Sequence, residues 1–219
     1  MNRAEKRRQQ KKAKKTGASP GGRISGPGLG APNIQQILDA ALQHHGAGRL
    51  PEAERGYQQV IQLDPKHPVA LHLLGVAAQQ SGKVDLAVDL IRKAVAVAPD
   101  YAEAHYNLGA ILHDLGKLDE AAASYHRALA HQPDYAKAHF NLGNTLKELG
   151  KLDDAAASYG KALALQPDYA KAYYNLGVVL HMLNRLDDAA ASYQRVLAIE
   201  PDYAKAHFNL GNTLNDLER

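Results

Sequence analysis

The side chains of this sequence that could perform chemistry do not assemble into a catalytic or metal site. Eleven histidines are present, but those at equivalent positions, such as His113 and His181, are too far apart in the sequence to place ligand atoms at about 2.1 Å from one zinc ion. Ser124, Ser158 and Ser192 lack the partners of a catalytic triad and the turn of a nucleophile elbow. Cysteine is absent, which excludes a disulfide framework, a thiolate metal site and a cysteine nucleophile. We therefore expect no catalysis by this chain, no metal and no cofactor.

Side chains that could hold a peptide recur at equal intervals. An asparagine amide offers an acceptor oxygen and two N–H donors, so a row of asparagines can pair with the backbone of an extended partner. Such a row, in which each asparagine follows an aromatic residue that would add apolar contact, is formed by Tyr106-Asn107, Phe140-Asn141, Tyr174-Asn175 and Phe208-Asn209. Further polar candidates on the same intervals are Lys137, Lys171, Lys205, Asn144 and Asn212. We predict that these side chains bind peptide, and the alternative is that they are solvated residues copied by duplication.

A period of 34 residues accounts for these intervals. The segment PDYAKAHFNLGNTL occurs at 133–146 and again, unchanged, at 201–214. Five complete units follow from this period, at 34–67, 68–101, 102–135, 136–169 and 170–203. Residues 204–219 would form the first helix of a sixth, incomplete repeat that acts as a cap. Because this segment is no more polar than its siblings, a truncated chain is an equally favoured interpretation.

Two helices are expected in each unit. Leu108, Leu112 and Leu115 recur at the spacing of one helical face, and the second helix of a unit would end at the proline that closes it. We predict aspartate N-caps for the first helices, at Asp100, Asp134, Asp168 and Asp202, with Asp100 and Glu103 at capping-box spacing. We predict a left-handed residue after each first helix, at Gly48, Gly82, Gly116, Gly150 and Asn184.

Glycines also recur in the middle of the first helices, where each costs about 0.8–1 kcal/mol relative to alanine. They are Gly75, Gly109, Gly143, Gly177 and Gly211. Close packing against a neighbouring helix would offset this cost, and the expected contacts are Ala87, Ala121, Ala155 and Ala189.

The unit resembles a tetratricopeptide repeat, whose pattern of large and small residues is filled here by Leu142, Gly143, Leu146, Ala155, Tyr159 and Pro167, with His139 in place of the opening aromatic residue. The match covers 34–219 and weakens in the first unit, where Ala40 and Ala41 replace the Leu-Gly pair. The resemblance implies an all-α fold, a right-handed superhelical array (α-solenoid) of antiparallel helix pairs. It also implies a concave surface, lined by the first helices, that holds peptides.

The repeats are most similar to those of O-linked N-acetylglucosamine transferases and their bacterial relatives, in which an asparagine ladder recognises protein substrates. That role would fall on Asn107, Asn141, Asn175 and Asn209, and the ladder is broken in units one and two. A second family mode, the carboxylate clamp for peptide C-termini, would use the three lysines named above, but its other lysine position is aromatic here. The resemblance implies a non-catalytic scaffold for protein–protein interaction that binds extended peptides, or alternatively the substrate-recognition arm of a larger or truncated protein glycosyltransferase.

Charge separates the first 32 residues from the rest of the chain. Residues 1–32 carry nine basic and one acidic side chain, a net charge of +8, whereas the remainder carries 17 basic and 22 acidic side chains, a net charge of −5. Because this segment combines a basic stretch with a Gly/Pro-rich linker, we expect it to be disordered.

Neither a membrane-spanning run nor a secretory signal is present, and with the lack of cysteine this favours a cytoplasmic location. The basic tail could hold nucleic acid or another anionic surface, although no aromatic residue is interleaved for base stacking, and a solubilising extension is the favoured alternative. The basic residues that would make this contact are Arg3, Lys6, Arg7, Arg8, Lys11, Lys12, Lys14 and Lys15.

Overall fold

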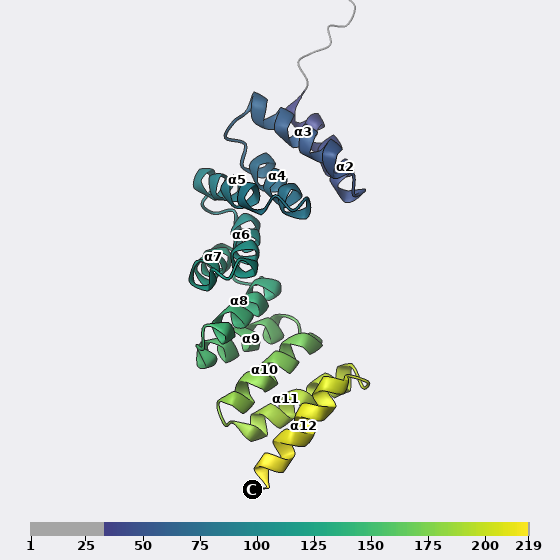
Figure 1. Ribbon diagram of the computed structural model, residues 1–219, viewed down its shortest axis with the longest axis vertical. Coiled ribbons are helices and arrows are strands. Elements are labelled where there is room, and N and C mark those ends of the chain that lie inside the picture. Colours follow the sequence, from purple (N-terminus) through teal and green to yellow (C-terminus); the bar gives the residue numbers. More distant parts are fainter. Residues whose placement is uncertain (1–32, 219) are drawn as a thin grey trace, which may run out of the picture. The chain divides into compact units, whose positions relative to one another are not determined.

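The computed structural model describes residues 33–218, and every regular element in that range is an α-helix (Figure 1). The expectations for the basic tail at 1–32 lie outside the described residues and stay predictions. The predicted all-α fold built from antiparallel helix pairs is confirmed.

First and second helices alternate along the chain. The first helices are α2 (Ile34–Gly46), α4 (Pro68–Gln80), α6 (Ala102–Asp114), α8 (Ala136–Glu148), α10 (Ala170–Met182) and α12 (Ala204–Leu217). The second helices are α3 (Leu50–Leu63), α5 (Val84–Val97), α7 (Leu118–His131), α9 (Leu152–Leu165) and α11 (Leu186–Ile199). Each first helix begins at the first residue of a 34-residue unit.

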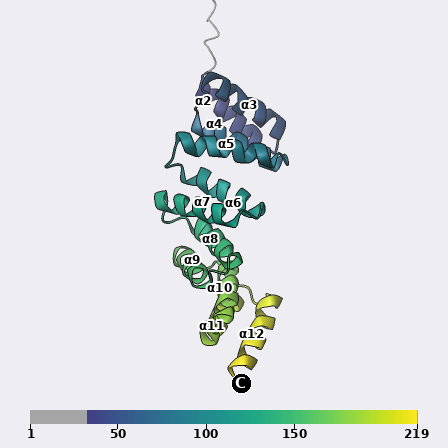
Figure 2. The same cartoon turned by 60° about the vertical axis from the view of Figure 1, so that its left-hand side comes forward.

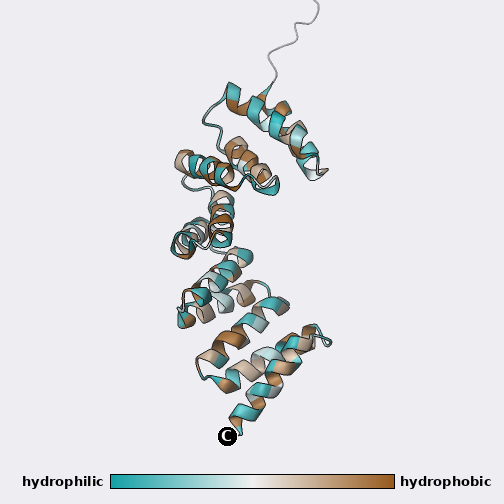
Figure 3. Cartoon of the chain, in the orientation of Figure 1, coloured by the Kyte–Doolittle hydropathy of each residue, from teal (hydrophilic) through white to brown (hydrophobic). Residues whose placement is uncertain are grey.

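Each helix packs against the helices that precede and follow it, so that consecutive hairpins stack (Figure 2). First helices also contact one another in steps of one unit, from α4 through to α12. Apolar residues recur in every helix (Figure 3). One buried cluster extends from Ala78 in α4 to Val179 in α10, which shows that neighbouring units share a core.

The C-terminal ends of the first helices follow the prediction, whereas their N-terminal ends differ from it. Gly48, Gly82, Gly116 and Gly150 adopt φ values of 72–76° and Asn184 adopts 58°, so the predicted left-handed C′ positions are confirmed. Leu115, expected on the apolar face of α6, is instead the C-cap residue of that helix and 43% exposed.

The predicted aspartate N-caps are wrong. The N-cap residues are Tyr101, Tyr135, Tyr169 and Tyr203, none of which makes a side-chain capping bond. Each aspartate lies one residue earlier, in a turn that is one residue longer than the capping pattern assumes, and the capping-box pairing of Asp100 with Glu103 fails for the same reason. Among α4, α6, α8, α10 and α12, only α4 has a side-chain N-cap, in which His67 Nδ1 accepts a hydrogen bond from the Ala70 backbone N–H at 3.2 Å.

The mid-helix glycines are closely packed, but mostly against tyrosine rather than alanine. A Cβ atom added at Gly109, Gly143 or Gly177 would lie 2.7–2.8 Å from a ring carbon of the tyrosine in the following second helix. Those rings belong to Tyr125, Tyr159 and Tyr193, each nearly or fully buried. Only Gly75 lies against a predicted alanine, the Ala87 carbonyl oxygen, with Ile91 closer still, and nothing lies within 4 Å of the Cβ position of Gly211.

Candidate peptide-binding wall

One face of the first helices lies opposite the face that is buried in the core. On α8 this face carries Lys137, Asn141, Asn144 and Glu148, which are spaced three or four residues apart and therefore lie in one line along the helix. The opposite face, with Leu142, Gly143 and Leu146, is buried. We call the line on α8, with its counterparts on α6, α10 and α12, the inner wall. The counterparts are Glu103, Asn107, Ala110 and Asp114 on α6, Lys171, Asn175, Val178 and Met182 on α10, and Lys205, Asn209, Asn212 and Asp216 on α12.

The asparagine ladder is hydrogen-bonded across the inner wall, from each first helix to the one before it. The bonds join Asn107 Nδ2 to His72 Nε2 (2.7 Å), Asn141 Nδ2 to Tyr106 OH (3.1 Å), Asn175 Nδ2 to Asn144 Oδ1 (2.8 Å) and Asn209 Nδ2 to Tyr174 OH (3.2 Å). All four asparagines are half-buried. Each asparagine amide is thus held in place by donating one of its own N–H groups to the preceding first helix. Its Oδ1 atom accepts no hydrogen bond from residues 33–218.

Three of the four aromatic residues that precede the ladder asparagines pack against tyrosines of their own 34-residue unit. Tyr106 contacts Tyr125 and Tyr135, with ring centroids 5.9 and 4.8 Å away. Phe140 and Tyr174 lie in the same way between two tyrosines each. These three rings are half-buried and support the wall from behind, whereas Phe208 is 69% exposed.

The remaining predicted site residues differ in how much of them a partner could touch. Lys137, Lys171 and Lys205 are exposed at the start of their helices, and none makes a side-chain hydrogen bond or ion pair within the described part of the chain. Asn144 is half-buried and accepts from Tyr159 OH at 2.7 Å as well as from Asn175. Asn212 is exposed. The lysines and Asn212 are therefore the most accessible predicted side chains on the wall.

Histidine side chains also link successive first helices, which the sequence analysis missed. His113 Nε2 lies 3.2 Å from Glu148 Oε1, and His181 Nε2 lies 3.1 Å from Asp216 Oδ2. His45 Nε2 lies 3.1 Å from Gln80 Oε1. Each pair is separated by 35 residues, one more than the repeat. The signal in the sequence is this spacing of 35 residues between a histidine and an acidic or amide side chain. A small cavity of about 220 Å³ lies between His113, Asp114, Asn141 and Asn144.

In the second unit a buried histidine takes the place of the aromatic residue. His72 is fully buried, and burial lowers its pKa to about 4. Since Asn107 Nδ2 donates to His72 Nε2, the proton of the neutral ring is on Nδ1, which donates to Tyr101 OH at 2.9 Å. The ladder thereby continues into the second unit through a neutral imidazole.

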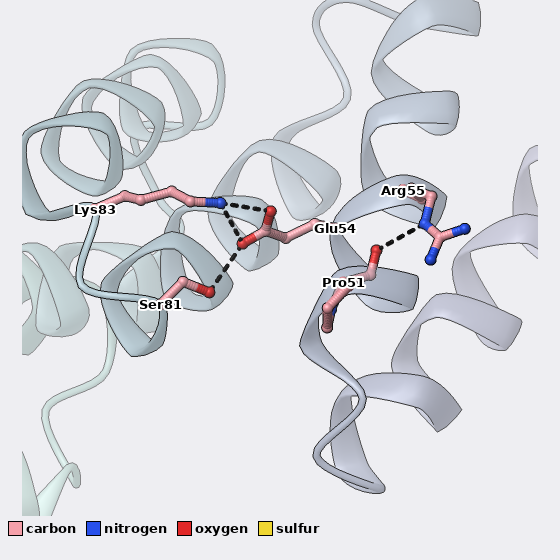
Figure 4. Close-up of polar contacts among 5 residues, drawn as sticks. All are labelled: Pro51, Glu54, Arg55, Ser81 and Lys83. Carbon is pink, nitrogen blue, oxygen red and sulfur yellow. Dashed lines mark hydrogen bonds and ion pairs between the residues drawn. The ribbon is translucent and has the colours of Figure 1, made fainter.

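On the second-helix side, an ion pair fastens the first unit to the second (Figure 4). Glu54 on α3 accepts from Lys83 Nζ at 2.8 Å and from Ser81 Oγ at 2.9 Å, both in the turn between α4 and α5. The bond from Lys83 lowers the pKa of the Glu54 carboxyl, and partial burial opposes this. The other units have Val88, Ala122, Ala156 and Ala190 at this position, so the contact is specific to one junction and structural in character.

Two properties of the described residues bear on other site classes. Between residues 33 and 218, no group of three or more His, Asp or Glu side chains is arranged to hold a metal ion. No helix in that range has the length and apolar character needed to cross a membrane.

Known proteins share this architecture. Family models of the tetratricopeptide repeat match residues 44–112, 140–204 and 183–219, and a model described as TPR repeat matches 109–150. The chain belongs to the tetratricopeptide-repeat proteins, whose fold supports protein–protein interaction in general. No curated protein sequence shows significant similarity to it.

Solved structures give the same fold. A crystal structure of MamA protein is 26% identical with a TM-score of 0.70, over 78% of this chain and 94% of that one. MamA from Desulfovibrio magneticus RS-1 (41-end) is 22% identical with a TM-score of 0.70, over 78% and 96%. YrrB, described as a TPR protein with an unusual peptide-binding site, is 23% identical with a TM-score of 0.71, over 80% and 91%. The last two similarities concern the fold alone, and the resemblance to glycosyltransferase repeats stays a prediction.

Proposed function

We propose that this chain is an interaction scaffold whose inner wall holds an extended segment of a partner protein. The observation that supports this most is the asparagine ladder, in which four amides at one helical phase are each fixed by one hydrogen bond to the preceding first helix. Their Oδ1 atoms can accept N–H groups from the backbone of an extended partner.

The internal bonds make the ladder ready to bind. Fixing a mobile side chain at an interface costs about 0.5–1.5 kcal/mol of conformational entropy. An amide that is already hydrogen-bonded to a neighbouring helix loses little further freedom when a partner binds. Since the ladder addresses backbone groups, it would accept partners of varied sequence. The exposed lysines at the start of α8, α10 and α12 would add contacts that depend on the partner's side chains.

The test uses the full chain and peptides selected against it from a random-sequence library. Replacement of Asn107, Asn141, Asn175 and Asn209 by alanine should weaken binding of the selected peptides by more than about tenfold, since each lost bond contributes roughly 0.5–1.5 kcal/mol. The matched control replaces four exposed amides outside the wall, Gln58, Gln132, Gln166 and Gln194. A folded ladder variant that binds as tightly as this control would contradict the proposal.

The alternative function, a substrate-recognition arm of a protein glycosyltransferase, would use the same asparagine ladder. It is distinguished by the gene sequence beyond codon 219, which would have to encode a transferase domain in the same reading frame. A cytoplasmic location, the expectation from composition, is tested separately by cell fractionation.

A further inference from the structure

A second kind of groove lies on the opposite side of the first helices from the inner wall. A cavity of about 610 Å³ lies between α7 and α9, with α8 as its floor. A cavity of about 540 Å³ lies one unit further, between α9 and α11, with α10 as its floor. Seven lining positions of the two cavities coincide after a shift of 34 residues, among them His139 with Tyr173 and Lys161 with Arg195. We call them the α7–α9 groove and the α9–α11 groove.

On either side of the α7–α9 groove, the chain's own side chains make contacts that the α7–α9 groove lacks. In the α9–α11 groove, the guanidinium carbon of Arg195 lies 5.6 Å from the centre of the Tyr173 ring, a cation–π contact over the floor. At the preceding junction, Arg92 Nη2 on α5 bonds to Glu120 Oε2 on α7 at 2.7 Å and so bridges the two second helices. At these two junctions, Arg195 and Arg92 thus each have a partner within the chain.

The α7–α9 groove has the equivalent residues but neither the cation–π contact nor the bridge between second helices. His126 and Asp154 replace the bridging Arg92 and Glu120, and His139 replaces the larger Tyr173 ring. Neither Lys161 nor the Asp154 carboxylate makes a hydrogen bond or ion pair with residues 33–218. The floor is apolar, formed by Leu142 and Leu146.

The His139 ring is a fixed part of this floor. Its Nε2 donates to the Pro133 carbonyl oxygen at 2.9 Å, which prevents the ring from turning into the space beneath Lys161. Burial lowers the pKa of His139, so the ring is neutral at pH 7 and does not repel an apolar ligand. The result is an open slot with an apolar floor, lined at its sides by the Lys161 ammonium and the Asp154 carboxylate.

We propose that the α7–α9 groove is a second binding site, which takes an aromatic side chain from a partner protein. The ring would lie over His139 and Leu142 beneath the Lys161 ammonium, in the arrangement that Tyr173 and Arg195 form within the neighbouring groove. The contact between Tyr173 and Arg195 in the α9–α11 groove thus indicates that an aromatic ring would fit the α7–α9 groove. Because His139 and Leu142 lie on the opposite face of α8 from Asn141, this site is separate from the inner wall.

The probe is N-acetyl-tryptophan amide, with N-acetyl-leucine amide as its control, because neither is an extended peptide long enough to lie along the asparagine ladder. The chain contains no tryptophan, so the fluorescence of the probe reports binding without background. The full chain should bind one probe molecule, and His139→Tyr, which introduces the residue of the next unit, should bind none. Tyr173→His should free the space beneath Arg195 in the α9–α11 groove and raise the number of bound probes to two.

Lys161→Ala should weaken binding by about two- to fivefold, the effect of one exposed cation–π contact. Gln58→Ala on α3, outside both the α7–α9 groove and the inner wall, should leave probe binding unchanged. Circular dichroism and melting check that each variant is folded, and if His139→Tyr does not fold, Tyr173→His and Lys161→Ala carry the test. Equal binding of the leucine amide, an unchanged number of sites in Tyr173→His, or loss of binding in folded Gln58→Ala would overturn the proposal.

Discussion

Gly143 and Gly211 form a matched pair that isolates the energy of helix packing. They occupy the same position in identical segments, 136–146 of α8 and 204–214 of α12. A Cβ atom at Gly143 would lie 2.7, 2.8 and 3.0 Å from three ring carbons of Tyr159, whereas a Cβ atom at Gly211 would meet nothing within 4 Å. Substitution by alanine should therefore destabilise the chain at Gly143 and stabilise it at Gly211.

The magnitudes follow from two terms. Alanine gains about 0.8–1 kcal/mol over glycine in a helix interior at either position. At Gly143 the Tyr159 ring cannot yield easily, because it is fully buried and its hydroxyl donates to Asn144 Oδ1 at 2.7 Å, so overpacking costs about 1–3 kcal/mol. The helix term cancels in the comparison, and the difference between the two variants should be about 1–3 kcal/mol, the overpacking cost alone.

Hydrogen exchange of backbone amides is the suitable assay, because repeat proteins can unfold one part at a time and a single melting temperature would average over them. Gly143→Ala should lower protection in α8 and α9, and Gly211→Ala should raise it in α12. If Gly143→Ala raised protection in α8 as Gly211→Ala does in α12, Tyr159 would not fill the space beside Gly143, and the account of how the hairpins pack would be refuted.

Three further predictions concern charge. Because burial lowers the pKa of His72 from 6.5 to about 4, the neutral ring stabilises the fold above pH 6.5. The free energy of unfolding therefore falls by up to about 3 kcal/mol in total as the pH falls from 6.5 toward 4. The urea midpoint of His72→Tyr should depend less on pH in this range than that of the unaltered chain. An equal pH dependence of the two midpoints would contradict the lowered pKa of His72. Glu54→Ala should lower the free energy of unfolding by about 1 kcal/mol at pH 7, whereas the control Glu103→Ala should change it little. Because the pKa of Glu54 is lowered in the folded chain, the difference between the two variants in urea titrations should disappear as the pH falls below about 4.5. Deletion of residues 1–15 should abolish retention on a polyanion column if the tail holds anionic partners, and identical elution with the full chain would exclude that role.

The sequence predicted those features of the fold that depend on local backbone conformation. The left-handed residues Gly82 and Asn184 could be located because few other residues adopt that conformation at low cost. The tyrosine that fills the space beside Gly109 could not be chosen in this way, because Ala121 and Tyr125 lie four residues apart on the same face of α7. The periodicity identifies the face, but the length of the side chain decides which residue reaches across.

Contacts between repeats were harder to predict. The phase shared by the ladder asparagines is visible in the sequence, but the bond from Asn141 to Tyr106 depends on how one first helix is offset against the next. The contact between His113 and Glu148 has the same 35-residue separation and was missed for the same reason. Sequence periodicity gives the repeat, and only the stacked helices show that neighbouring side chains meet one residue out of phase.

A crystal structure of the full chain with a peptide selected for binding would test the central claim most directly. The account predicts an extended peptide along α6, α8, α10 and α12, with its backbone N–H groups about 2.7–3.2 Å from the Oδ1 atoms of the ladder asparagines. A peptide bound elsewhere, with the ladder amides still solvated, would contradict it.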